Sequence, residues 1–208
     1  MDNVVKSRSA AVILEEAAAS FQAVVTTAAA VERAADIVLK ALRAGGKVMF
    51  CGNGGSAADA QHLAAELLGR FLLERPSWAA LALGSNSSAV TAIGNDYGFD
   101  QVFARQLAGL GRAGDVLVGI STSGKSSNIV EAFNTAKQMD VTAIALTGIK
   151  DSPMSELADH AIRAPAELTP RIQEMHIAIG HTICELVEMR MQEADTAHFP
   201  GRPQALDR

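Results

Sequence analysis

The sequence CGNGGSAADAQHLAAELLGR, residues 51–70, sets the pattern for the rest of the chain. It ends a short apolar run, KVMFC at 47–51, passes through a glycine-rich turn and then becomes helical in pattern. Glycine lets a backbone approach a ligand closely, and the helix behind the turn offers free N–H groups. His62 and Glu66 are four residues apart, so a helix places them on one face. The stretch predicts a strand, a ligand-binding loop and a helix that carries two polar groups.

The same alternation of short apolar runs and helical patterns continues toward the C-terminus. Strands that are apolar on both faces and alternate with helices are typical of a parallel sheet covered on each side. We expect strands at 47–51, 78–83, 115–120, 141–148 and 160–164, and helices at 56–69, 86–94, 101–110, 127–139 and 170–194. The fold class that this pattern predicts is α/β, in a single domain.

Residues 9–43 have a helical pattern, with apolar residues at helical spacing and charges between them. β-branched residues cluster at 24–27, which predicts a break there, with Thr26 or Thr27 as the cap of a second helix. We expect an N-terminal helical extension over 1–45 that packs on the core and on other subunits; an arm folded back on its own core alone is the alternative. The core domain is expected over 46–195 and a loosely ordered tail over 196–208.

Composition and charge argue against several classes of function. The net charge is −5 and no basic run is longer than a pair, which is unlike a nucleic-acid-binding surface. Glu15 and Glu16 interrupt the first apolar stretch, so the N-terminus does not resemble a signal peptide. No window reaches the ~18 uncharged apolar residues of a membrane span. Cys51 and Cys184 lack metal-binding spacing and are expected to be buried free thiols in a reducing compartment. We therefore expect a cytoplasmic protein with neither a nucleic-acid nor a membrane partner.

A second loop with ligand-binding character, STSGKS at 121–126, follows the apolar run DVLVGI. Its hydroxyl groups are donors for phosphate oxygens, whereas Lys125 is expected to remain in solvent. In an open parallel sheet, ligands bind at the carboxyl ends of the strands, where both loops are expected. Neither loop has the glycine spacing of a Walker A or dinucleotide motif, so no nucleotide cofactor is expected. Two such loops predict a phosphate-binding site.

The last predicted helix is strongly apolar, yet it carries Gln173, His176 and His181 within RIQEMHIAIGHTICELVE, residues 171–188. A polar side chain on an apolar helix is expected to have a partner. His176 is expected to be structural or to lie next to the site. Gln173 and His181 could complete a tetrahedral metal site with His62 and Glu66. A carboxylate and a histidine could equally be a base and an acid that move protons beside a carbonyl, and the spacing does not separate the two options.

Four segments in order, CGNGGSAADAQHLAAEL, TAIGNDYGF, GDVLVGISTSGKSSNI and RIQEMHIAIGH, resemble the sugar-isomerase (SIS) domain family and, within it, the phosphoheptose isomerases. The resemblance implies a three-layer α/β/α sandwich with a five-stranded parallel sheet, and a homotetramer with active sites at subunit interfaces. It also implies isomerisation of sedoheptulose 7-phosphate to D-glycero-D-manno-heptose 7-phosphate through an enediol, which supplies heptose for lipopolysaccharide or other surface glycans.

The resemblance also assigns roles to residues. It makes Glu66 and His181 the catalytic base and acid, and it implies one zinc ion per subunit on His62, Glu66, Gln173 and His181. The substrate-binding residues that it implies are Asn53, Gly54, Gly55, Ser56, Glu66, Asn95, Asp96, Ser121, Thr122, Ser123, Ser126 and Gln173. Some members carry an aspartate directly before the arginine of RIQE, where this chain has Pro170 after Thr169. Any sugar contact from that aspartate is therefore absent or made differently here.

Two alternative functions are consistent with the sequence. Some SIS relatives are non-catalytic tetramers that bind the bacterial replication initiator, and the segments HFP and LLERPS resemble them. Those relatives lack the catalytic glutamate and the later histidine, whereas this chain has Glu66 and His181, which favours an enzyme. The other alternative is a sugar-phosphate sensor without turnover, although a sensor does not require the histidine–glutamate pair.

Overall fold

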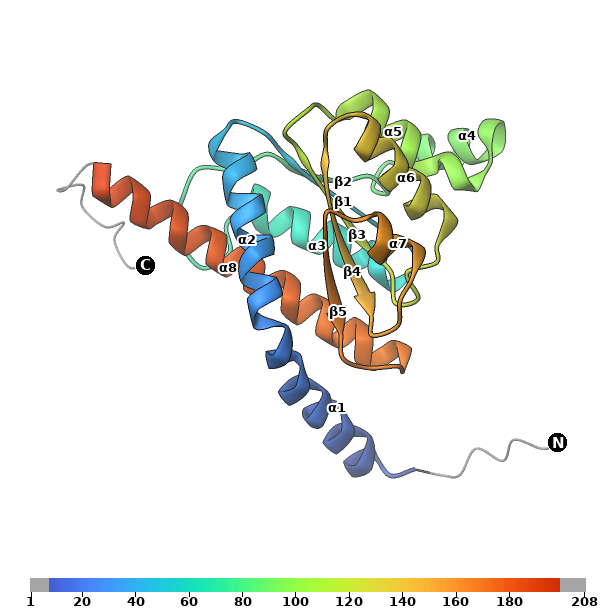
Figure 1. Cartoon of the computed structure of the whole chain (residues 1–208), viewed down its shortest axis with the longest axis vertical. Helices are drawn as coiled ribbons and strands as arrows, with labels where there is room; N and C mark the ends of the chain where they lie inside the picture. The colour runs from blue at the N-terminus through green and yellow to red at the C-terminus, as the bar shows by residue number, and fades with distance from the viewer. Residues whose placement is uncertain (1–7, 199–208) are drawn as a thin grey trace.

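The computed structural model describes residues 8–198, and these form one α/β unit (Figure 1). The sheet has five strands in the order β2-β1-β3-β4-β5, and every neighbouring pair is parallel. The strands are β1 (Val48–Gly52), β2 (Ala80–Ala82), β3 (Val116–Ile120), β4 (Thr142–Gly148) and β5 (His160–Ala164). The predicted fold class and the predicted five-stranded sheet are confirmed.

The strand order reverses between β1 and β3. After β1 the chain moves outward to β2, and it then returns to the other side of β1 to form β3. Gly52, at the carboxyl end of β1, pairs in register with Ile120, at the carboxyl end of β3. The two loops singled out in the sequence therefore begin side by side at the topological switch point, where open α/β sheets bind their ligands.

Helices cover both faces of the sheet, as Figure 1 shows. Helices α2 (Ala28–Arg43), α3 (Gly55–Leu68) and α8 (Thr169–His198) pack on one face with Phe50, Val118 and Leu146. Helices α5 (Val102–Leu110), α6 (Ser127–Gln138) and α7 (Pro153–Leu157) pack on the other with Met49 and Leu117. Successive strand residues point to opposite faces, so these nearly continuous apolar runs are buried on both sides.

The N-terminal helices are α1 (Ala10–Val24), a 3₁₀ turn (Val25–Thr27) and α2. The predicted break is confirmed, and Thr27 occupies the N-cap position of α2, but its side chain makes no capping hydrogen bond. The hydroxyls of Thr26 and Thr27 donate to the carbonyls of Ala23 and Val24 behind them and not to the start of α2. Helix α1 has no buried residue, and Figure 1 shows it projecting from the body of the molecule. By length and composition alone, Ala10–Arg43 would suffice to cross a membrane, although α2 buries one face against the core.

Two helix ends differ from the sequence-based expectation. Helix α4 (Ser87–Tyr97) includes Asn95 and Asp96, which were expected in a loop. It starts where Asn86 accepts the N–H of Ala89, and it stops only at Gly98, whose φ of 91° suits glycine. Helix α8 continues to His198, past the end predicted at 194. Residues 199–208 of the predicted tail lie outside the described residues.

His176 is fully buried on α8, and its Nε2 donates to the carbonyl of Thr147 at 3.1 Å. Its Nδ1 is buried without a hydrogen-bond partner in the described part of the chain. Burial lowers the pKa of His176 from 6.5 to about 4, and the hydrogen bond to Thr147 acts in the opposite direction. The ring is therefore neutral in the folded protein and has a structural role.

The low pKa of His176 predicts a loss of stability in mild acid. Below pH 6.5 the unfolded chain takes up a proton that the folded chain refuses until about pH 4, so stability falls as the pH drops through that window. We expect His176 to account for about 2–3 kcal/mol between pH 7 and pH 4.5. Urea unfolding of the wild type and of His176→Gln at both pH values measures this loss in the free energy of unfolding. A stability difference between the two proteins that does not change with pH would contradict the assignment.

Candidate active site with a possible metal centre

Three polar side chains from two helices converge at one point. His62 and Glu66 come from α3 and His181 from α8, and one ligand atom from each lies within 4.8 Å of the others. His62 Nε2 is 3.2 Å from Glu66 Oε1 and 2.8 Å from His181 Nε2. The two imidazole rings are 5.0 Å apart between centroids and tilted by 58°. The structure thus brings together both residues expected to be catalytic and one further predicted ligand.

The approach of α3 to α8 explains why these side chains meet. Gly180 precedes His181, and a Cβ at Gly180 would lie 2.5 Å from Leu63 Cδ1. Leu63, the neighbour of His62, is itself buried. Glycine leaves room for the Leu63 side chain as it is packed at this crossing, and the residues beside the contact are then within reach of each other.

The three donor groups fit a metal ion. Two histidines and a glutamate are a known ligand set of catalytic zinc, in which the fourth position stays open. Ligand atoms of a tetrahedral zinc site, each at roughly 2.0–2.2 Å from the ion, are roughly 3.3 Å from one another. The spacings of 2.8 and 3.2 Å are close to that value. Two imidazole nitrogens that face each other either share a proton or direct both lone pairs at one cation.

Gln173, the fourth predicted ligand, lies elsewhere on α8. Its amide is against Gly55 at the start of α3, where a Cβ on Gly55 would be 2.6 Å from Gln173 Nε2. His62 is seven residues further along α3, about 10 Å at the helical rise. In this structure the Gln173 amide therefore lies against the first glycine-rich loop, at the start of the helix that carries His62.

The glycine-rich loop after β1 is tied to the helix that follows β3. The side chains of Asn53 and Asn128 exchange two hydrogen bonds of 2.9 Å each. Gly54 has a φ of 57°, which favours glycine, and Ser56 is buried in the first turn of α3. The exposed backbone of Gly54 and Gly55 lies at the N-terminus of α3, which is a favourable position for an anion or a polar ligand.

The hydroxyl-rich loop after β3 is held by its own side chains. Ser121 Oγ lies 3.1 Å from Ser126 Oγ, and it accepts the N–H of Gly124 at 3.2 Å. Ser123 Oγ accepts the N–H of Lys125. Gly124 has a φ of 64°, and any Cβ there would collide with Ser152. The loop ends at the N-terminus of α6, where free N–H groups and hydroxyls are in place for a phosphate group.

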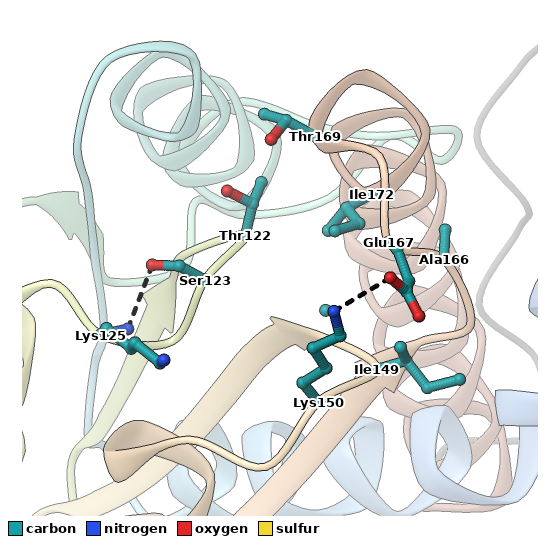
Figure 2. Close-up of a pocket in the computed structure, with 10 residues that line it drawn as sticks. Thr122, Ser123, Lys125, Ile149, Lys150, Ala166, Glu167, Thr169 and Ile172 are labelled. Atoms are coloured by element: carbon teal, nitrogen blue, oxygen red, sulfur yellow. Dashed lines mark hydrogen bonds and ion pairs between the residues drawn. The ribbon is translucent and has the colours of Figure 1, made fainter.

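A cleft of about 230 Å³ opens beside this loop (Figure 2). Thr122, Ser123 and Lys125 line it from the loop, and Thr169 and Ile172 line it from α8. Thr169 is thus in the cleft next to the position of the missing family aspartate. Figure 2 also shows the ion pair between Lys150 Nζ and Glu167 Oε2, 2.9 Å long, which joins two loops at the cleft.

Asn95 and Asp96 are not in that cleft. Asn95 Nδ2 donates to Asp96 Oδ1 at 2.8 Å, and both side chains are exposed at the end of α4. Asp96 borders a different cleft of about 490 Å³ between α4 and α5, next to Tyr97 and Arg105. Arg105 stacks on the Tyr97 ring at 3.6 Å. In the single chain, neither Asn95 nor Asp96 lines the cleft beside the hydroxyl-rich loop.

Asp59 is a carboxylate near the histidines that our sequence analysis did not select. Burial raises the pKa of Asp59, while attraction to His62 and His181 acts in the opposite direction. Asp59, His62 and Glu66 follow the i, i+3, i+7 spacing of one helix face, and that spacing could have identified it. Arg75 and Glu188, which form a buried ion pair near the site, were also missed.

The glycine contact predicts an unusual outcome for an alanine substitution. Alanine normally stabilises a helix by about 0.5–1 kcal/mol relative to glycine. We expect Gly180→Ala instead to destabilise the protein by about 1–3 kcal/mol, the cost of overpacking, and to weaken divalent-metal binding. Gly109→Ala, on α5 with nothing within 4 Å of the added Cβ, is the matched control and should be neutral or stabilising. Denaturant titration and zinc titration compare the two, and equal stabilisation by both would contradict the close contact.

Comparison with known proteins identifies the family. Residues 14–148 match the SIS domain family. The chain is 57% identical over 159 residues to the phosphoheptose isomerase of Rhodospirillum rubrum. The aligned residues make up 76% of this chain and 85% of that protein. It is 58% identical over 158 residues to that of Akkermansia muciniphila, with 76% and 84% covered.

Solved structures agree with the sequence comparison. The phosphoheptose isomerase from Neisseria gonorrhoeae superposes with a TM-score of 0.82 at 44% identity, over 86% of this chain and 96% of that one. The enzyme from Francisella tularensis also gives a TM-score of 0.82, at 38% identity, over 88% and 100%. With this sequence identity, this sheet order and these converging side chains, the chain belongs to the SIS domain family and, within it, to the phosphoheptose isomerases.

Proposed function

We propose that this protein is an aldose–ketose isomerase that converts sedoheptulose 7-phosphate to D-glycero-D-manno-heptose 7-phosphate. The observation that carries the proposal is the convergence of His62, Glu66 and His181 within 4.8 Å, on a chain that is 57% identical to a phosphoheptose isomerase. A carboxylate and an imidazole in contact range are the groups that proton transfer between neighbouring carbons requires. The product would supply heptose for lipopolysaccharide or another surface glycan.

The reaction divides between Glu66 and His181. In the open-chain ketose, Glu66 removes the proton from the carbon beside the carbonyl, which gives an enediol. The carbonyl oxygen takes up a proton to complete the enediol. A proton is then returned to the former carbonyl carbon while the other enediol hydroxyl loses its proton, which leaves the aldehyde, and His181 is the acid for this second transfer. Glu66 is half-buried with its side chain 22% exposed, so it remains accessible to a small substrate. Both groups project from rigid helices, which limits the motion needed to reach the reacting atoms.

We propose zinc as the metal, held by His62, Glu66 and His181. When bound, zinc would stabilise negative charge on the enediol oxygens as a Lewis acid. A glutamate committed to a metal is a weaker base, so Glu66 can fulfil both roles only if one of its oxygens stays free for the proton. We assign Gln173, whose amide lies against Gly55, to the same set as the fourth ligand and to the sugar as a contact.

The phosphate group of the substrate would bind the hydroxyl-rich loop. Thr122 and Ser123 line the cleft, and the hydroxyls of Ser121 and Ser126 lie 3.1 Å apart in the same loop. We assign all four hydroxyls to the phosphate. The net charge of −5 provides no general attraction for an anion, so binding depends on these local donors and the α6 N-terminus. Contacts to the phosphate group, far from the reacting carbons, position the carbon chain of the substrate for proton transfer. Asn53, Gly54, Gly55 and Ser56 are assigned to the sugar.

The alternatives are less well supported. A non-catalytic scaffold that binds the replication initiator does not need the His62–Glu66–His181 cluster. Phosphoheptose isomerases are 52–58% identical to this chain over about 160 aligned residues. A sugar-phosphate sensor needs the phosphate loop but not the cluster. We therefore favour the enzyme over both.

We further propose a cytoplasmic homotetramer with active sites completed between subunits. Helix α1 exposes Val12, Ile13, Leu14 and Phe21, and Arg171 on α8 donates to the carbonyl of Ile13. Because α1 is apolar and has no buried residue in the single chain, we propose that other subunits cover it. Residues 1–45 would then be an extension that packs on the core and on other subunits, and residues 46–195 would be the core. Asn95 and Asp96, which lie outside the cleft of their own chain, could then contribute to the site of a neighbour.

The catalytic assignment is tested by incubation of the purified protein with sedoheptulose 7-phosphate. We expect turnover by the wild type, and a loss of at least ~100-fold in kcat for Glu66→Gln and for His181→Gln, the effect of losing a general base or acid. Each variant keeps the size of the side chain while removing the group that accepts or donates the proton. Treatment with a chelator should abolish activity, and added zinc should restore it.

Two results would reject parts of this proposal. Full activity in both variants would remove the roles given to Glu66 and His181. Unchanged activity after complete removal of metal would remove zinc from the reaction while leaving the proton-transfer roles intact. Absence of turnover together with robust capture of the replication initiator would favour the scaffold.

The tetramer is tested by size-exclusion chromatography with light scattering. The wild type should have the mass of four 21.7 kDa chains. Leu14→Glu places a charge on a side chain that is 68% exposed in the single chain, so it should dissociate the tetramer without unfolding the core. Lys137→Glu, on the exposed side of α6, is the charge-change control and should remain tetrameric. A wild type that is monomeric at all concentrations would exclude the tetramer.

A further inference from the structure

A buried ion pair lies close to the candidate active site. Glu188 on α8 and Arg75 have side chains that are only 2% and 8% exposed, and Glu188 Oε1 accepts from Arg75 Nε at 2.8 Å. The same carboxylate accepts the backbone N–H groups of Phe71, Leu72 and Leu73. A buried charge is costly unless its hydrogen bonds are made, and here both oxygens are used. All of these partners belong to one segment, residues 71–75.

The carboxylate of Glu188 is held in its ionised form. Burial by itself raises the pKa of Glu188, but the hydrogen bonds from Leu72, Phe71, Leu73 and Arg75 outweigh it and leave the pKa lower than usual. The ion pair is therefore intact at neutral pH, and the 71–75 segment is anchored to α8.

Arg75 also fixes the end of α3. Its Nη2 donates to the carbonyl of Glu66 at 2.8 Å, and its Nη1 donates to the carbonyl of Leu67 at 3.0 Å. Carbonyls in the last turn of a helix lack intrahelical partners, and a guanidinium group can satisfy several of them at once. The guanidinium is stacked 3.6 Å above the Trp78 ring, which restricts its position further. The backbone of Glu66 is thus held by the same arginine that pairs with Glu188.

The anchored segment reaches His181 through Phe71. The Phe71 ring lies 5.5 Å from the His181 ring between centroids, and His62 is 5.0 Å from the same imidazole. Glu188 is seven residues after His181, two helical turns on nearly the same face of α8. Glu188 accepts the N–H of Phe71 and so holds the Phe71 ring against the imidazole of His181, which lies on the same helix as Glu188.

We propose that Glu188 and Arg75 are positioning residues for the isomerase, which orient Glu66 through its backbone and His181 through the ring of Phe71. Neither residue touches the reacting atoms. The kinetic part of this proposal rests on the proposed function, whereas the orientation of the His181 ring can be measured without any turnover. Loss of the ion pair should therefore impair proton transfer more than substrate binding, because the phosphate loop lies on different elements, β3 and α6.

The chain contains a matched pair for comparison. Asp115, with a side chain 3% exposed, pairs with Lys47 and accepts the N–H groups of Lys47 and Arg112. It precedes β3, and Lys47 precedes β1, so this pair lies at the amino ends of the strands, away from the two ligand-binding loops at their carboxyl ends. Like Glu188, Asp115 is a buried carboxylate that pairs with a basic side chain and accepts backbone N–H groups. Asp115→Asn removes this charge without affecting Glu66 or His181. It controls for a loss of stability alone.

Kinetics at a temperature where every variant is folded give the first test. For Glu188→Gln we expect kcat to fall about 10- to 100-fold, the range for groups that orient catalytic or metal-binding side chains, with KM within about 3-fold. Phe71→Leu, which leaves both charges in place, should lower kcat as well. Asp115→Asn should keep kcat within about 2-fold of the wild type. Equal kcat values for Asp115→Asn, Phe71→Leu and Glu188→Gln would overturn the proposal.

A double-mutant cycle tests the route through Phe71. If Glu188 acts on His181 through this ring, Glu188→Gln and Phe71→Leu together should lower kcat by less than the product of their separate effects. Phe71→Leu combined with Asp115→Asn should be additive. Additivity in both cycles would reject Phe71 as the link, and if Glu188→Gln does not fold, a wild-type kcat in Phe71→Leu would reject it too.

The His181 ring provides a readout that is independent of the reaction. In protein labelled at its histidines, the ring resonances of His181 should shift in Glu188→Gln and in Phe71→Leu but not in Asp115→Asn. An unchanged His181 resonance in the first two variants would overturn the proposal even if the protein is an active isomerase. A shifted resonance in a protein that does not turn over sedoheptulose 7-phosphate would support the positioning role and reject the proposed function instead.

Discussion

The close contact of α3 and α8 at Gly180 is the constraint on which the site depends. A Cβ at this position would overlap Leu63 where that side chain now lies, so glycine lets the helices cross at this distance without displacing buried Leu63. Residues beside the contact, His62 on one helix and His181 on the other, are thereby brought to 2.8 Å between their Nε2 atoms. Two facing imidazoles and a carboxylate form a set of donors that needs a proton or a cation between its members.

The switch point of the sheet provides the other half of the site. Both ligand-binding loops leave neighbouring strands at the same edge, and each leads into the N-terminus of a helix. Helix α8 connects the two halves, since Ile172 lines the cleft at the hydroxyl-rich loop and His181 lies about 14 Å further along the helix. A substrate with an anionic group at one end and a carbonyl near the other suits this arrangement. The protein binds one end with fixed donors and places titratable groups at the other.

Buried charges in this fold serve to fix loops. Glu188 and Asp115 each accept backbone N–H groups in addition to pairing with a basic side chain, so neither leaves unused oxygens in the interior. Asp115 joins the amino ends of two strands, and Glu188 joins a loop to α8 near the histidines. The same device thus stabilises the start of two strands in one case and the surroundings of the candidate active site in the other. His176, neutral and bonded to Thr147, links α8 to β4 in a similar way but without a charge.

The sequence alone determined the alternation of strands and helices, the parallel sheet and the two loops, because apolar runs bounded by glycine and hydroxyl residues are local signals. It also placed His62 and Glu66 on one helix face, since i, i+4 spacing is a local property. It did not determine that α4 would continue through Asp96, that Thr26 and Thr27 would bond backward, or that Gln173 would lie against Gly55. Only the tertiary structure decided the meeting of His62 with His181, 119 residues later, and the pairing of Arg75 with Glu188, 113 residues later. Such contacts depend on how closely two helices pack, and that distance follows from the shapes of side chains on both and not from the pattern of either one.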